Sequence, residues 1–231
     1  MLICSNKTFL IKNKFEATSL IKRKRVLCFG DSITWGFNPV DEMRMNEEER
    51  WTGVLASGLG EKYTIIEEGL NSRTTVWDDP EKGPSKNGLK YLIPCLGSHK
   101  PLDLVILMLG TNDMKHRFSL PTTEIARGIN VLVDVILKSE SGIDGLKPEI
   151  LLMSPPYLHD ETGFEDEFRN SYNKSKKLPG YVKKIADKNG CHFLDSSKIM
   201  TASELDGVHP EIEEHKKLAT VLIKEVHSII G

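Results

Sequence analysis

The runs LVILML (104–109) and EILLM (149–153) are nearly continuous in apolar residues. Such runs are typical of strands that are covered on both faces, as in a parallel sheet. Three shorter apolar runs complete the set of expected strands, at 25–29, 63–67 and 191–194. Because longer stretches with helical spacing separate these runs, the sequence predicts alternating β and α elements.

Five helices are expected, over 50–59, 88–98, 122–140, 166–189 and 211–230. Within 166–189, Pro179 and Gly180 are expected to break the pattern into two pieces, because proline removes a helical hydrogen bond. Alternating strands and helices predict an α/β fold: a three-layer α/β/α, flavodoxin-like doubly wound sheet of about five parallel strands. Residues 25–231 are expected to form one domain, and residues 1–24 a disordered or loosely attached N-terminal tail.

The composition excludes several classes of protein. The chain has 231 residues, of which 39% are hydrophobic, and 31 lysines and arginines against 33 aspartates and glutamates give a net charge of −2. A near-neutral chain offers no electrostatic reason to bind nucleic acid or an anionic membrane. No apolar run approaches the roughly 18 residues of a membrane span. These features predict a cytoplasmic protein.

The four cysteines are scattered and form no CxxC pair, so neither a disulfide framework nor a zinc site is expected. Cys28 and Cys191 lie in strand-like runs and are interpreted as buried free thiols. Six of the seven histidines, all except His209, lack metal-ligand spacing and are interpreted as surface or packing residues: His99, His116, His159, His192, His215 and His227. No metal and no cofactor are predicted.

Polar residues follow the expected strands. Gly30-Asp31-Ser32 comes directly after the first strand, where a serine at a helix start can meet backbone N–H groups that bind negative charge. A plain turn is an alternative; an aspartate-nucleophile phosphatase motif would need an aspartate where Ile33 stands. Asn112 follows another strand and offers a neutral amide donor, or else a helix cap.

Two further segments complete the candidate site. Gly69 follows the second strand and can offer a backbone N–H or serve as a turn glycine. Asp206 and His209 are three residues apart before the last helix, where a carboxylate can orient an imidazole; a cap beside a surface histidine is the alternative. A doubly wound sheet brings all four segments to one edge, so we expect Ser32 and His209 to meet.

The sequence resembles the SGNH (GDSL-type) hydrolase superfamily, and within it the arylesterase/acyltransferase branch. The matching blocks are GDS at 30–32, Gly69, GTND at 110–113 and DGVH at 206–209, and the likeness covers most of 25–155. The segment 157–190 shows little resemblance, although its acidic loop at 157–170 is expected to border the substrate pocket.

The resemblance implies a role for each matched residue. Ser32 would be the nucleophile, His209 the general base and acid, and Asp206 the orienting carboxylate. The backbone N–H groups of Ser32 and Gly69 and the side-chain amide of Asn112 would form the oxyanion hole. Trp35 is a candidate wall of the substrate pocket, with packing as the alternative. The resemblance also implies homo-oligomers.

The expected function is a serine esterase that hydrolyses small, short-acyl carboxylic esters through an acyl-enzyme, with acyl transfer to alcohols as a further outcome. The partner would be a small-molecule ester, with neither nucleic acid nor membrane. A carbohydrate O-acetyl esterase and a lysophospholipase or thioesterase are alternatives within the fold. A non-catalytic flavodoxin-like binding module is the alternative from another class.

Overall fold

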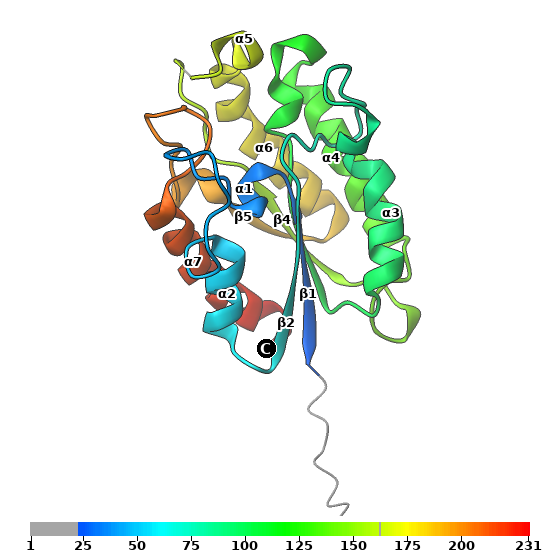
Figure 1. Ribbon diagram of the computed structural model, residues 1–231. Coiled ribbons are helices and arrows are strands. Elements are labelled where there is room, and N and C mark those ends of the chain that lie inside the picture. The colour runs from blue at the N-terminus through cyan, green and yellow to red at the C-terminus, as the bar shows by residue number, and fades with distance from the viewer. Residues whose placement is uncertain (1–22, 162) are drawn as a thin grey trace, which may run out of the picture.

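The computed structural model of the chain describes residues 23–161 and 163–231 and is built around one parallel sheet (Figure 1). The strand order is β2-β1-β3-β4-β5, the order of flavodoxin-like folds. The strands are β1 (Lys24–Gly30), β2 (Tyr63–Gly69), β3 (Leu104–Met108), β4 (Glu149–Ser154) and β5 (His192–Asp195). All five predicted strands and the doubly wound fold are therefore confirmed.

Helices cover both faces of the sheet and make the three predicted layers. On one face lie α2 (Trp51–Leu59) and α7 (Ile212–Ile230); on the other lie α3 (Gly88–His99), α4 (Thr122–Leu137) and α6 (Tyr172–Asn189) (Figure 1). Side chains of β1 alternate between the layers: Val26 and Cys28 pack with α2 and α7, whereas Leu27 and Phe29 pack with α3, α4 and α6. Burial on both faces explains why the strands are apolar throughout.

The expected helix over 166–189 does break, but not at proline. A short helix, α5 (Glu165–Phe168), is followed by Arg169–Ser171 and then by α6, which runs through Pro179 without interruption. Leu178 and Val182 flank Pro179 and are fully buried. Their packing outweighs the single hydrogen bond that the proline removes. The predicted break at Pro179 and Gly180 is thus wrong.

Two other expectations can be compared with the structure. Cys28 is a buried free thiol as predicted, whereas Cys191 is free but only half-buried, since it precedes the edge strand β5. The tail predicted for 1–24 lies almost wholly outside the described residues, and Lys24 already belongs to β1. Within the described ranges, every helix is too short or too polar to cross a bilayer.

The connections that follow the strands reach the carboxyl edge of the sheet together. β1 leads directly into the four-residue helix α1 (Ser32–Trp35), and β2 leads into a turn at 70–73. β3 leads to the 3₁₀ helix η2 (Asn112–Met114), and the loop before α7 carries 206–209. Ligands of open α/β sheets bind at this edge, so the site is sought there.

Candidate active site

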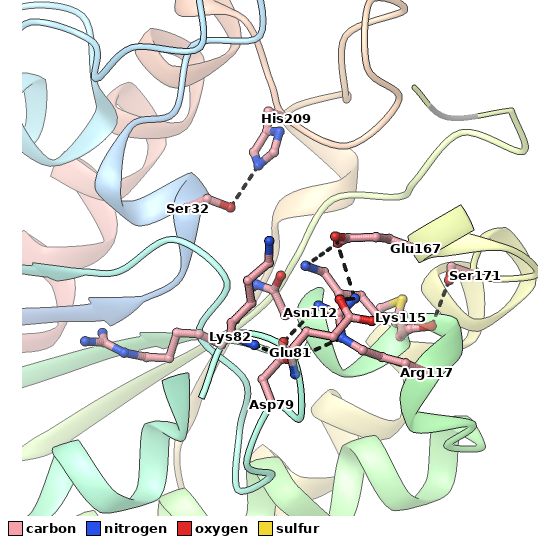
Figure 2. Close-up of polar contacts among 12 residues, drawn as sticks. Ser32, Asp79, Glu81, Lys82, Asn112, Lys115, Arg117, Glu167, Ser171 and His209 are labelled. Atoms are coloured by element: carbon pink, nitrogen blue, oxygen red, sulfur yellow. Dashed lines mark hydrogen bonds and ion pairs between the residues drawn. The ribbon is translucent and has the colours of Figure 1, made fainter. Parts of the chain in front are cut away.

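Ser32, His209 and Asp206 form a continuous chain of hydrogen bonds. Ser32 Oγ lies 2.9 Å from His209 Nε2, and His209 Nδ1 lies 2.6 Å from Asp206 Oδ2. Figure 2 shows the serine and the imidazole facing each other across the first of these contacts. All three residues are buried, with 5–7% of their surface exposed. The structure therefore brings the side chains of Ser32 and His209 within hydrogen-bonding distance, as the sequence predicted.

Asp206 is held so that its second oxygen faces the imidazole. Its Oδ1 accepts the backbone N–H groups of Val208 and His209, each at 2.8 Å. Burial acts to raise the pKa of Asp206, but the hydrogen bond from the His209 side chain and its charge hold it below the ordinary value. An ionised carboxylate at this position fixes the ring so that Nε2 faces Ser32.

Ser32 is the first residue of α1, and Asp31 caps that helix. Asp31 Oδ1 accepts the N–H of Ile33 at 3.1 Å, and the Ser32 N–H has no acceptor among the described residues. Burial raises the pKa of Asp31 to about 6. The unpaired Ser32 N–H at a helix start is suited to bind developing negative charge.

A cavity of about 260 Å³ opens beside the serine. Phe37 lies over the imidazole, with ring centroids 4.2 Å apart and planes tilted by 35°. Trp35, the predicted wall residue, does not line the cavity, because its ring faces Arg44 instead, with the guanidinium carbon 5.5 Å from the ring centroid. The lining residues are Ser32, Phe37, Glu42, Asn71, Ser72, Lys82, Thr111, Asn112, Lys115, Phe164, Glu167, Phe168, Val208 and His209.

The structure does not bring Gly69 to this cavity. Leu70 N–H donates to the Gly30 carbonyl at 3.2 Å, so the alternation of a parallel ladder turns the Gly69 N–H away from β1, the strand that leads to Ser32. Gly69 is required there for another reason. A Cβ at this position would lie 2.2 Å from the Trp35 backbone nitrogen.

Ser72 occupies the position at the cavity that the sequence assigned to Gly69. It lines the cavity and has φ of +65°, in the left-handed region. Its N–H has no acceptor among the described residues. The sequence carried no signal for this role, because a left-handed backbone usually favours glycine and this position holds serine.

Asn112 bonds to this turn and also lines the cavity. Its Nδ2 donates one hydrogen to the Arg73 carbonyl at 3.1 Å, which leaves its second amide hydrogen for another acceptor. Three N–H groups without an acceptor among the described residues therefore lie around Ser32: its own backbone N–H, that of Ser72, and the second amide hydrogen of Asn112.

Asp113, next to Asn112, ties two loops together. Its carboxylate accepts the Thr75 N–H at 3.0 Å and the Thr75 hydroxyl. Burial raises the pKa of Asp113 to about 7. The contact joins the loop after β3 to the loop after β2, the two segments that carry Asn112 and Ser72.

We expect Asp113→Asn to flatten the pH dependence of stability. The folded protein keeps the Asp113 proton to a higher pH than the unfolded chain does, so stability falls as pH rises from about 4 to about 7. Removing this group should reduce the loss in unfolding free energy between pH 5 and pH 8 by about 2 kcal/mol. Urea unfolding at both pH values measures the difference. The exposed Asp41→Asn serves as control, and an unchanged slope in Asp113→Asn would refute the assignment.

The wall of the cavity opposite the triad is charged. Lys115, only 4% exposed, pairs with Glu167 at 2.5 Å, and Arg117 contacts Glu167 at 3.6 Å and Asp79 at 2.9 Å (Figure 2). Burial lowers the pKa of Lys115, although the bond to Glu167 opposes this. The network joins the segment around Asp79 to α5. As expected, the acidic loop borders the pocket, through Glu167.

The same loop is bound to the loop that carries Asp206. His159 N–H donates to the Gly207 carbonyl and Gly163 N–H donates to the Asp206 carbonyl, each at 2.9 Å. Phe164 follows directly, and its ring is nearly perpendicular to that of His209, with centroids 6.2 Å apart. Two backbone hydrogen bonds therefore join one wall of the cavity to the loop that carries the aspartate of the triad.

One group of residues has the composition of a metal site. Donor atoms of Glu68, Cys95 and His99 lie within 4.8 Å of one another, and Cys95 and His99 are one turn apart on α3. The Glu68 carboxylate is already used: Oε1 lies 2.9 Å from His99 Nε2, and Oε2 accepts the Tyr91 hydroxyl at 3.0 Å. Burial raises the pKa of the Cys95 thiol to about 12. This chemistry favours a hydrogen-bonded cluster over a metal site.

A doubly wound sheet whose carboxyl edge carries a serine bonded to a buried histidine–aspartate pair is the arrangement of hydrolases of the SGNH class. The chain belongs to the GDSL-like lipase/acylhydrolase family, whose model matches residues 28–216. It is an esterase that acts on carboxylic esters.

Solved structures support this membership. Est24, a carbohydrate acetylesterase from Sinorhizobium meliloti, is 40% identical with a TM-score of 0.85, over 90% of this chain and 100% of that one. An inhibitor-bound aryl esterase of M. smegmatis is 39% identical, with the same TM-score and coverage. A further carbohydrate acetylesterase family member from Sinorhizobium meliloti is 35% identical, with a TM-score of 0.85 over 90% of this chain and 99% of that one. No curated protein matches the sequence significantly.

Proposed function

We propose that the chain hydrolyses small carboxylic esters through an acyl-enzyme formed on Ser32. In this mechanism His209 takes the serine proton as Ser32 attacks the ester carbonyl, and then gives it to the departing alcohol. Asp206 stabilises the imidazolium that forms in between. The observation that carries the proposal is the 2.9 Å contact between Ser32 Oγ and His209 Nε2, with Asp206 bonded behind the ring.

The tetrahedral oxyanion would be bound by the N–H groups of Ser32 and Ser72 and by the Asn112 amide. Ser72 replaces Gly69 in this role, because Ser72 lines the cavity and its N–H is unused, whereas the Gly69 N–H points away from β1. Donors fixed by the fold need no reorganisation when charge develops, which is why such groups contribute strongly to catalysis.

Substitutions at Ser72 test this donor. Ser72→Gly keeps the N–H and suits a φ of +65°, so we expect kcat within about two-fold of the wild type. Ser72→Pro removes the N–H and cannot adopt a positive φ, so kcat should fall by about 10²–10³-fold. Steady-state hydrolysis of p-nitrophenyl acetate gives kcat, and circular dichroism confirms that each variant folds. A folded Ser72→Pro enzyme with normal kcat would exclude Ser72 as a donor.

The size of the cavity supports small substrates. Its volume of about 260 Å³ is below the roughly 300–1,000 Å³ that is common for ligand sites. A short acyl group fits such a space better than a lysophospholipid chain. After the alcohol leaves, water or a second alcohol can attack the acyl-enzyme, so transfer to alcohols is part of the proposal.

A carbohydrate O-acetyl esterase is the second candidate. The cavity lining includes four charged side chains, Glu42, Lys82, Lys115 and Glu167, which suit the hydroxyl groups of a sugar better than an aliphatic alcohol. Est24, the similar structure described above, is a carbohydrate acetylesterase. A panel of p-nitrophenyl esters of increasing acyl length, acetylated sugars, a lysophospholipid and a thioester separates these activities by kcat/KM.

Covalent labelling tests the proposal itself. An organophosphate or sulfonyl fluoride reagent should modify Ser32, and peptide mass spectrometry should locate the adduct there. Labelling should require the ionisable imidazole, so His209→Ala should remain unlabelled under the same conditions. An absence of adduct on every serine would favour the non-catalytic binding module.

A further inference from the structure

Arg73 is a buried cation at the end of the sheet, and it plays no part in the mechanism above. It is 2% exposed, and one of its nitrogens, Nη1, donates to the carbonyls of both Gly30, at 2.8 Å, and Glu68. Its guanidinium carbon lies 4.3 Å from the Phe29 ring centroid and 5.1 Å from that of Tyr91. None of the ion pairs among the described residues involves Arg73.

The two carbonyls that Arg73 binds stand at the ends of the strands that carry the oxyanion donors. Gly30 ends β1 and is followed by Asp31 and Ser32, whereas Glu68 lies at the end of β2, ahead of the turn that contains Ser72. One guanidinium therefore joins the exits of both strands. Two backbone donors, the N–H groups of Ser32 and Ser72, lie within four residues of the carbonyls it binds.

The backbone of Arg73 completes the same arrangement. Its N–H donates to the Leu70 carbonyl at 3.1 Å and closes the turn, while its own carbonyl accepts the Asn112 amide at 3.1 Å. Ser72, inside this turn, has a positive φ, which costs a non-glycine residue free energy. Contacts around Arg73 hold the turn in this conformation.

We propose that Arg73 is a positioning residue of the oxyanion site: its guanidinium fixes the turn that presents the Ser72 N–H, and its carbonyl aims the Asn112 amide. The inference rests on the proposed function. A purely structural filler would be better served by an apolar side chain, since burying an unpaired cation is costly. Burial lowers the pKa of Arg73, in line with this cost. Unlike an apolar side chain, the guanidinium donates hydrogen bonds to the carbonyls of Gly30 and Glu68 at the ends of the two strands.

The test compares Arg73→Ala and Arg73→Lys in the full chain with p-nitrophenyl acetate. We expect Arg73→Ala to lower kcat by about 10–100-fold with KM within two-fold, because the donors act on the transition state. Arg73→Lys should recover only part of the loss, since a lysine cannot reproduce the planar guanidinium. Guanidinium ion, added well below denaturing concentration, should raise the kcat of Arg73→Ala and leave Arg73→Lys unchanged.

A double-mutant cycle with Asn112→Ala adds a readout that a merely structural role would not move. If Arg73 acts through the Asn112 amide, Arg73→Ala should cost much less in the Asn112→Ala background than in the wild type. Arg50→Ala is the matched control. Arg50 also supports β2, through bonds of 2.8 and 2.9 Å to Glu67, but does not touch the turn at 70–73. Its kcat should stay near that of the wild type.

The outcomes separate this inference from the proposed function. A wild-type protein that hydrolyses no ester and takes no label at Ser32 would refute the function. A wild-type esterase whose Arg73→Ala variant keeps its kcat or changes KM alone would overturn only the role of Arg73. Full additivity with Asn112→Ala would exclude the part of that role that acts through the Asn112 amide. Guanidinium rescue together with non-additivity would establish that role.

Discussion

Replacing Ser32 by alanine is expected to lower kcat for p-nitrophenyl acetate by at least about 10⁴-fold, because serine, histidine and aspartate of a triad act as a unit. The substitution removes only the atom that attacks the carbonyl. The oxyanion donors and the cavity remain, so the residual activity should exceed the rate in water. Initial rates at saturating substrate measure the loss, and the organophosphate label should disappear from the variant.

Ser141→Ala provides a matched control for this experiment. Ser141 is a fully buried serine whose carbonyl accepts the N–H of Leu102. Because Leu102 comes just before β3, Ser141 lies near the amino edge of the sheet. Its loss should affect stability without changing kcat. The triad assignment would be wrong if Ser32→Ala kept a tenth or more of the wild-type rate.

Asn112→Ala carries the second large effect. Loss of one oxyanion donor typically costs about 3–4 kcal/mol, so kcat should fall by about 10²–10³-fold while KM changes little. The side chain lines the cavity and has one amide hydrogen to spare after its bond to the Arg73 carbonyl. Asn112→Asp keeps the shape but offers an anion in place of a donor, and should be at least as damaging.

Asn130→Ala is the control for this prediction. Asn130 lies on α4, where it bonds to Asp134 and Asn189, and it does not line the cavity. We expect its kinetic constants to match the wild type. A variant of Asn112 with a normal kcat and a raised KM would show that the amide binds the ground state rather than the oxyanion.

The fold could be predicted from the sequence because its elements follow local patterns. Apolar runs such as 104–109 are interpreted as buried parallel strands once helices alternate with them. The ends of each strand in the structure lie within one or two residues of the predicted ends. The meeting of Ser32 and His209 followed from topology alone, since carboxyl ends of parallel strands share an edge. Neither conclusion needed knowledge of long-range packing.

The errors arose where tertiary packing decides the outcome. Pro179 would end an isolated helix, but the buried neighbours Leu178 and Val182 keep α6 continuous. The predicted break belongs instead to Arg169–Ser171, where Asn170 adopts a φ of +63°. Residue type alone does not reveal which of these two effects is larger.

The site residues that were misplaced share a different cause. Gly69 was assigned a donor role because glycine permits close approach. In the structure it is the Trp35 backbone that approaches Gly69 closely. Ser72 has a positive φ, which serine disfavours, so its residue type does not predict this backbone conformation. Trp35 points away from the cavity and Phe37 covers His209, a difference set by how the short helix α1 ends. Homo-oligomer formation stays a prediction.

The paired backbone bonds from His159 and Gly163 to residues 206 and 207 have a practical consequence. These two amide protons can exchange with deuterium only when their hydrogen bonds to the carbonyls of Gly207 and Asp206 break. Their exchange rates therefore report, in the resting protein and without any substrate, how often these two loops separate. A reagent that stiffens this part of the molecule should slow both amides together, which gives a way to screen for natural ligands before any turnover is seen.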